Sequence, residues 1–284
     1  MKRLNITAVL LALMILCSCG NAGKVQKSDK IYTTFYAMYD FTREIAGDKL
    51  EIVQLVPSGS GPHDFEPTAA AVADVTHSKA LVYCGSVDTY IGGIKDTAEK
   101  AGVRTLDTSV GIELEDGADP HVWLSPENAL RQYTAICGML CEIDPENSEY
   151  YKSRLAAAGE RIRALDSEIK ELAAAASKHD IIVSHQAYAY LCRDLGITAH
   201  GIEGSVGGSD PTAKHMAETA QLANELGIKI IFAQKNESDK TARALAREIG
   251  GDVLLLDPFE SDTGTGSYFD LMNMNIQALG TALK

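Results

Sequence analysis

Positive charge is scarce in this sequence, and several common metal-binding and membrane-spanning signatures are missing from it. Its 26 Lys and Arg residues face 39 Asp and Glu residues, for a formal net charge of −13. That balance argues against nucleic-acid binding, which needs a basic patch. There is no HExxH motif of the metalloprotease kind, and no apolar run approaches the roughly 20 residues of a membrane-spanning helix.

Cysteine is also sparse, and no CxxC pair is present to hold zinc through thiolates. Two of the six cysteines lie in the N-terminal segment. The other four are expected to be small buried side chains; they are Cys84, Cys137, Cys141 and Cys192.

The N-terminal segment has the pattern of an export signal. Two basic residues precede an apolar stretch at 6–16 that is too short to cross a bilayer. The sequence LCSC at 16–19 then resembles the cleavage box of bacterial lipoproteins, with Cys19 as the residue that carries lipid. Plain secretion with a removed signal is the alternative. We predict a signal and lipobox over 1–19, a polar tether over 20–30, and a lipid anchor on the extracytoplasmic face of the cell membrane.

Predicted strands and helices alternate along the rest of the chain, a pattern typical of parallel sheets covered by helices on both faces. We predict an α/β fold with two similar lobes, the first over 31–144 and the second over 179–284. Between them, 145–178 carries apolar residues at spacings of three and four, which indicates one long connecting helix. A coiled-coil arm would show the same spacing. Lobes on both sides favour a helix that packs against them.

Three histidines lie where a predicted strand gives way to a turn or to a helix start. His121 stands between two prolines in DPHVWLSP at 119–126, beside the only tryptophan, so its backbone has few conformations available. His63 follows a turn rich in glycine and proline, and His185 follows the apolar run 181–183. Because ligands collect at the carboxyl ends of parallel strands, these imidazoles are candidate metal ligands.

A fourth candidate ligand lies in the acidic turn 257–262, where Asp262 is preferred to Asp257. Three imidazoles and one carboxylate suit zinc in tetrahedral geometry, whereas manganese and calcium favour more oxygen ligands. The long gaps between these residues exclude a zinc-finger clip and fit one ligand from each of four loops. The other histidines are expected to have ordinary polar roles: His77, His179, His200 and His215.

The same motifs resemble those of the zinc- and manganese-specific solute-binding proteins of ABC importers. They are GPHDFEP at 61–67, DPHVWL at 119–124, Ser184-His185 before a helix with aromatic residues, and LDP at 256–258 with Asp262. The resemblance covers most of the chain from about residue 31. It implies that His63, His121, His185 and Asp262 coordinate a metal ion between the lobes, and that a membrane permease receives the ion.

In manganese-type members of that family the third position tends to be glutamate, so His185 favours zinc. The sequence departs from the family pattern in two places. The histidine-rich loop of some zinc members is absent, and the short acidic segment 113–119 takes its place. The loop 203–208 is unusually rich in glycine.

The sequence therefore predicts a monomeric, lipid-anchored receptor that captures Zn(II) and delivers it to an ABC permease, with no enzymatic activity and no nucleic-acid partner. A Mn(II) or mixed-metal receptor of the same type is one alternative, and a surface adhesin is another. A zinc hydrolase is the third, but it needs a general base beside the metal. Glu66 is the only such base that the motifs offer.

Overall fold

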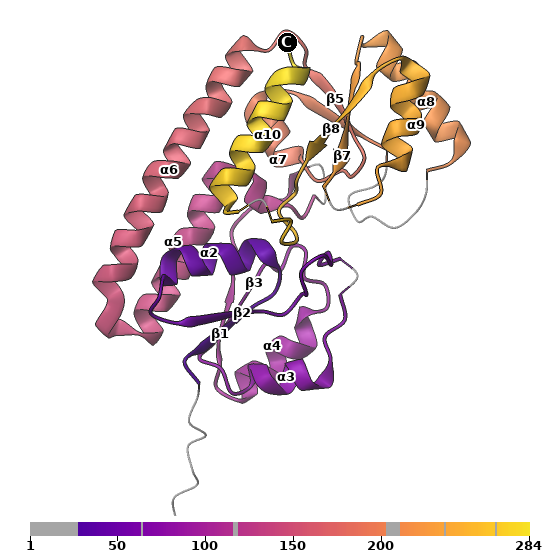
Figure 1. Cartoon of the computed structure of the whole chain (residues 1–284). Helices are drawn as coiled ribbons and strands as arrows, with labels where there is room; N and C mark the ends of the chain where they lie inside the picture. The colour runs from indigo at the N-terminus through magenta and orange to yellow at the C-terminus, as the bar shows by residue number, and fades with distance from the viewer. Residues whose placement is uncertain (1–27, 64, 116–118, 203–210, 236, 265) are drawn as a thin grey trace, which may run out of the picture.

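Two parallel four-stranded sheets organise the protein (Figure 1). The computed structural model describes residues 28–63, 65–115, 119–202, 211–235, 237–264 and 266–284. The first sheet has the order β2-β1-β3-β4, with β1 Lys30–Thr33, β2 Glu51–Gln54, β3 Ala80–Tyr83 and β4 Arg104–Asp107. The second has the order β6-β5-β7-β8, with β5 Asp180–Val183, β6 Thr198–Gly201, β7 Ile230–Gln234 and β8 Asp252–Leu256. The two sheets thus repeat one topology.

Helices cover both faces of the first sheet. They are α2 Tyr36–Ala46, α3 Ala69–Val75 and α4 Ile91–Lys100. Figure 1 shows α2 on the face toward the second lobe and α3 and α4 on the opposite face. The start of α3 is set by Thr68, whose hydroxyl accepts a hydrogen bond from the backbone N–H of Ala71.

Four helices flank the second sheet. They are α7 Ala189–Leu195, α8 Ala213–Glu225, α9 Lys240–Ile249 and α10 Tyr268–Ala282. Gly196 and Gly250 end α7 and α9 at φ angles of 67° and 64°, the left-handed conformation that glycine adopts easily at the end of a helix. Ser267 and Asp270 form a capping box at the start of α10. The segment just before this cap carries Glu260, so the cap fixes one end of that segment.

Two long helices lie along the chain between the first sheet and the second. They are α5 Pro126–Ile143 and α6 Ser148–Ala175, with the short 3-10 turns η3 Val122–Leu124 and η4 Pro145–Asn147 before them. The 28 residues of α6 would extend about 40 Å at 1.5 Å per residue. Helix α6 packs against α5 and α2 on the side of the first lobe and against α7 and α10 of the second lobe. It is therefore a packed connecting helix and not a free coiled-coil arm.

The main hydrophobic core is continuous between the lobes. It includes Ile31 and Phe41 of the first lobe, Ile162 and Leu165 of α6, and Leu279 of the second lobe. Two smaller cores fill the space under α3 and α4 on one side and under α8 and α9 on the other. Because one core passes through both lobes, side-chain packing fixes their relative position, and not only the chain that connects them.

The predicted α/β class, with two similar lobes and a long connecting helix, is confirmed. Helix α7 begins at Ala189 without a side-chain cap, whereas α8 begins at Ala213, where the Thr212 hydroxyl accepts from the backbone N–H of His215.

The predicted export signal, with Cys19, lies outside the described residues, as does the glycine-rich loop 203–208. Among the residues that the structure describes, no helix has the length and apolar character needed to span a bilayer. Cys84, Cys137 and Cys192 are buried, Cys141 is half-buried, and none of these four thiols forms a disulfide.

Candidate metal site

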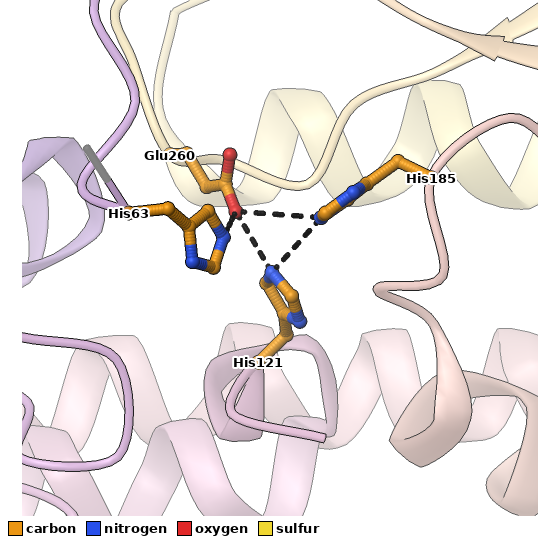
Figure 2. Close-up of side chains that lie close together, drawn as sticks. All are labelled: His63, His121, His185 and Glu260. Carbon is orange, nitrogen blue, oxygen red and sulfur yellow. Dashed lines mark hydrogen bonds and ion pairs between the residues drawn. The ribbon is translucent and has the colours of Figure 1, made fainter. Parts of the chain in front are cut away.

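Four loops at the carboxyl ends of strands bring three imidazoles and one carboxylate together between the lobes (Figure 2). From the first lobe, His63 follows β2 and His121 lies between β4 and η3. From the second, His185 follows β5 and Glu260 follows β8. One ligand atom from each of the four lies within 4.8 Å of the others. The predicted convergence of the three histidines is therefore found in the structure.

Glu260 is the centre of this cluster. Its Oε1 atom lies 2.9 Å from Nε2 of His63 and 2.8 Å from Nε2 of His121. The Nε2 atom of His185 lies 3.8 Å from the same oxygen and 3.3 Å from Nε2 of His121. All three imidazoles thus turn Nε2 toward one point, and His121 and His185 are buried while 12% of the His63 side chain is exposed.

His121 is held from behind by Asp119. Its Nδ1 atom lies 2.7 Å from Asp119 Oδ1, which also accepts the backbone N–H of His121. The other carboxylate oxygen accepts from the backbone N–H of Ala189 at the start of α7, and the Asp119 carbonyl accepts from the hydroxyl of Tyr190. A carboxylate on Nδ1 fixes the ring orientation and leaves Nε2 for a metal ion. Asp119 thus joins a loop of the first lobe to a helix of the second.

The turn that carries Glu260 has an unusual backbone. Phe259 has a φ of 63°, a value that residues other than glycine rarely adopt, and its side chain is fully buried. Asp257 folds the turn by accepting the N–H of Phe259 and the hydroxyl of Thr263. The indole of Trp123 donates to the carbonyl of Pro258 at 2.7 Å. These contacts direct Glu260 inward, where the amide of Gln234 donates to its second oxygen at 3.4 Å.

The residues of the cluster differ in pKa and therefore in charge at neutral pH. Burial lowers the pKa of His121, but hydrogen bonds with Asp119 and Glu260 outweigh burial and raise that pKa to about 9. Burial lowers the pKa of His185 to about 4. Burial acts to raise the pKa of Glu260, yet hydrogen bonds with His121 and His63 hold it below its usual range. Glu260 is therefore an anion at neutral pH and His185 is a neutral imidazole.

The structure does not bring Asp262, the predicted fourth ligand, to the three imidazoles. Asp262 is exposed and its carboxylate accepts the N–H of Gly264, while Asp257 is occupied within the turn. Glu260, between them, takes the place next to the imidazoles. A glutamate in an acidic turn after a strand was a signal in the sequence. The direction of the Glu260 side chain depends on the positive φ of Phe259, and no local sequence rule predicts that conformation for a phenylalanine.

The remaining candidates lie elsewhere. His200 pairs with Asp180 at 2.8 Å, and His77 bonds the carbonyl of Ala73, so the prediction of ordinary polar roles fits both. Glu66 is exposed and is not part of the four-residue cluster. The hydrolase alternative therefore loses the base that the sequence motifs offered it. Three imidazoles and a carboxylate form a complete four-ligand set for a borderline-soft divalent ion.

Comparison with known proteins identifies the family and the fold. The family model described as "ZnuA: Zinc-uptake complex component A periplasmic" matches residues 31–282. The chain belongs to the ZnuA family. The ZnuA family consists of components of an uptake complex and not of enzymes. The resemblance to metal-specific solute-binding proteins is thereby confirmed.

Individual members of the ZnuA family are similar over nearly the whole chain. The "High-affinity zinc uptake system protein ZnuA" of Bacillus subtilis is 30% identical over 95% of this chain and 94% of its own length. The "Zinc-binding lipoprotein AdcA" of Streptococcus pneumoniae is also 30% identical, and this chain spans 60% of its length. The solved structure of the Zn(II)-bound ZnuA-like domain of that AdcA is 30% identical, with a TM-score of 0.81 over 89% of this chain and 98% of the domain.

Proposed function

We propose that this protein is an extracytoplasmic receptor that captures Zn(II) between its lobes through His63, His121, His185 and Glu260. One observation carries the proposal: four side chains from both lobes present ligand atoms within 4.8 Å of one another. Membership of a zinc-uptake family supports the identity of the ion. The bound ion is delivered to the membrane permease of an ABC importer.

The ligand types favour zinc over manganese. Neutral imidazole suits zinc, whereas manganese prefers carboxylate, carbonyl and water oxygens. Three of the four ligands in this cluster are imidazoles, and Glu260 supplies the one negative charge. His185 decides the balance, because a glutamate there would make the set two imidazoles and two carboxylates. Four protein ligands leave no open position for a reactive water, as expected for a site that carries an ion.

Attachment to the membrane completes the proposed role. Lipid on Cys19, followed by the polar tether 20–30, would keep the receptor near the permease on the extracytoplasmic face. We propose that the receptor acts as a monomer, since the site is built from one chain.

Metal analysis of the purified protein, followed by competitive titration of zinc and manganese, tests the proposal. We expect wild-type protein to retain zinc and to prefer it strongly over manganese. His185→Glu should shift the preference toward manganese, because it replaces a nitrogen ligand with an oxygen ligand. His200→Glu is the matched control, since His200 lies outside the cluster and its replacement should leave the preference unchanged. An unaltered preference in His185→Glu would contradict the argument from ligand type.

A further inference from the structure

The segment 257–268 belongs to the second lobe by sequence but is fastened to helix α2 of the first lobe. The backbone N–H of Tyr36 donates to the carbonyl of Glu260 at 3.3 Å, and the Tyr36 hydroxyl donates to the carbonyl of Gly266 at 3.2 Å. One helical turn further along α2, the Asp40 carboxylate accepts the backbone N–H of Tyr268 at 3.0 Å. Three hydrogen bonds to α2 therefore hold this segment, at Glu260, Gly266 and Tyr268.

Asp40 is buried, which is unusual for a charged side chain. Only 2% of it is exposed, although Arg43, with which it forms an ion pair, is about half-exposed. Arg43 binds Oδ1 at 2.8 Å, while Oδ2 faces Tyr268, the first residue of the 15-residue helix α10. The first N–H groups of a helix lack partners within that helix and favour a negative charge. Asp40 thus provides a cap for α10 from the opposite lobe.

Aromatic packing ties the same segment to α2. The Phe259 ring lies 5.0 Å from the Tyr36 ring, 5.7 Å from that of Tyr268 and 6.4 Å from that of Phe41. The positive φ of Phe259 is a strained conformation for a residue with a Cβ, and it persists only where surrounding contacts determine it. Because Phe259 directly precedes Glu260, the direction of that carboxylate depends on the surface that α2 offers.

We propose that Asp40 and Tyr36 are positioning residues for Glu260: they hold the segment 257–268 so that its carboxylate meets the three imidazoles. Neither side chain is part of the four-residue cluster. Their effect on the metal is indirect and passes through the backbone of the segment. This inference rests on the proposed function, because Glu260 must itself be a ligand for its position to affect metal binding.

A double-mutant cycle tests the inference. Zinc affinity is measured by competition with a chelator for Asp40→Ala in wild-type protein and in the Glu260→Ala background. We expect Asp40→Ala to weaken zinc binding about tenfold in wild type, the loss that follows from removing one hydrogen bond to a charged group. It should have no further effect once Glu260 is absent. Asp40→Asn, which retains an oxygen for the Tyr268 N–H, should recover most of the affinity.

Two controls separate positioning from general destabilisation. Arg43→Gln removes the ion pair but leaves the bond from Asp40 to Tyr268, and it should bind zinc as wild type does. Asp88→Asn changes another buried aspartate of the first lobe, which bonds the N–H of Cys84, and it should also leave zinc binding unchanged. If Asp40→Ala does not fold, Tyr36→Phe removes one bond to the same segment and enters the same cycle, with an expected loss of about threefold.

The absorption of Co(II)-loaded protein gives a second reading, since visible bands report the number and type of ligands. The spectrum of Asp40→Ala should move toward that of Glu260→Ala, while that of Arg43→Gln should match wild type. A loss of affinity that is equally large in the Glu260→Ala background would refute the positioning role and leave the proposed function intact. A Glu260→Ala protein that binds zinc as tightly as wild type would instead refute the ligand set and this inference with it.

Discussion

His121 Nδ1 lies 2.7 Å from Asp119 Oδ1, and the opposite nitrogen of the same ring lies 2.8 Å from Glu260 Oε1. The ring therefore stands between two carboxylates, one from each lobe. Asp119 also accepts the N–H of Ala189, so it links the ring to the helix that follows His185. This relationship makes His121 the most strongly oriented of the three imidazoles.

We expect Asp119→Asn to weaken zinc binding about 10- to 100-fold, the usual cost of losing a carboxylate behind a metal-bound histidine. The substitution keeps the shape of the side chain but removes the charge that orients and activates the ring. Competition with a chromophoric chelator at fixed pH measures the effect. Asp180→Asn is the matched control, because Asp180 pairs with His200 at 2.8 Å outside the cluster. Equal affinities in the two variants would contradict the role assigned to Asp119.

Substitutions at Glu260 and Asp262 can be compared directly, since the two residues lie two positions apart in one acidic turn. Glu260→Gln should weaken zinc binding by a factor of about 100 or more, because it removes the only charged ligand from a buried site. Asp262→Asn should bind zinc as wild type does, because its carboxylate is exposed and bonds only its own turn in the described contacts. Isothermal titration of both proteins decides between the two carboxylates, and the opposite ranking would restore Asp262 as the ligand.

Zinc affinity should rise with pH up to about 9. The pKa of His121 in the metal-free protein is raised to about 9, so at neutral pH this ring must lose a proton before Nε2 can bind zinc. His185, with its pKa lowered to about 4, adds no proton loss above pH 5. We expect the dissociation constant to increase about tenfold for each pH unit between pH 8 and pH 6. Titrations in buffers of different ionisation enthalpy should detect the released proton, and a flat profile over this range would contradict the assignment.

Buried Asp88 should make the folded protein less stable as pH rises. Burial raises its pKa to about 7 from an ordinary value of 3.8, so the folded state holds its proton more tightly than the unfolded state. The stability it contributes is complete below pH 3.8 and is lost as pH rises through 7. At roughly 1.4 kcal/mol per pKa unit, this loss is of the order of a few kcal/mol.

Asp88→Asn should therefore flatten the dependence of the unfolding free energy on pH between 4 and 7, because an amide does not titrate. Urea unfolding at pH 4.5 and pH 7.5 measures the change. Asp252→Asn, an exposed aspartate at the start of β8, should keep the wild-type dependence. If the unfolding free energy of Asp88→Asn depended on pH as strongly as that of wild type, the Asp88 carboxyl would not be the source of that dependence.

Much of this architecture could be predicted from local patterns. The stripe of apolar residues on α6 indicated a helix that packs along one face, and Ile162, Leu165 and Ile169 are indeed buried. The three histidines could be selected because each follows a strand next to turn-forming residues, and parallel strands bring such positions to one edge. These features depend on residues close together in the sequence.

The choice of Glu260 depended on contacts between distant residues. The acidic turn offers three carboxylates, and only the tertiary fold distinguishes them: Asp257 is occupied by backbone and hydroxyl donors, and Asp262 points to solvent. The direction of Glu260 follows from the positive φ of Phe259 and from the contact with α2, more than 200 residues away in the chain. No periodicity or spacing in the sequence encodes such a contact.

The single tryptophan of the chain forms one wall of the metal site. Trp123 is fully buried, its ring lies 5.3 Å from that of His121, and its N–H is bonded to the turn that carries Glu260. All indole emission from this protein therefore originates beside the cluster. An ion that reaches His121 changes the charge next to that fluorophore, so loading and unloading of the receptor can be followed in real time without an added dye.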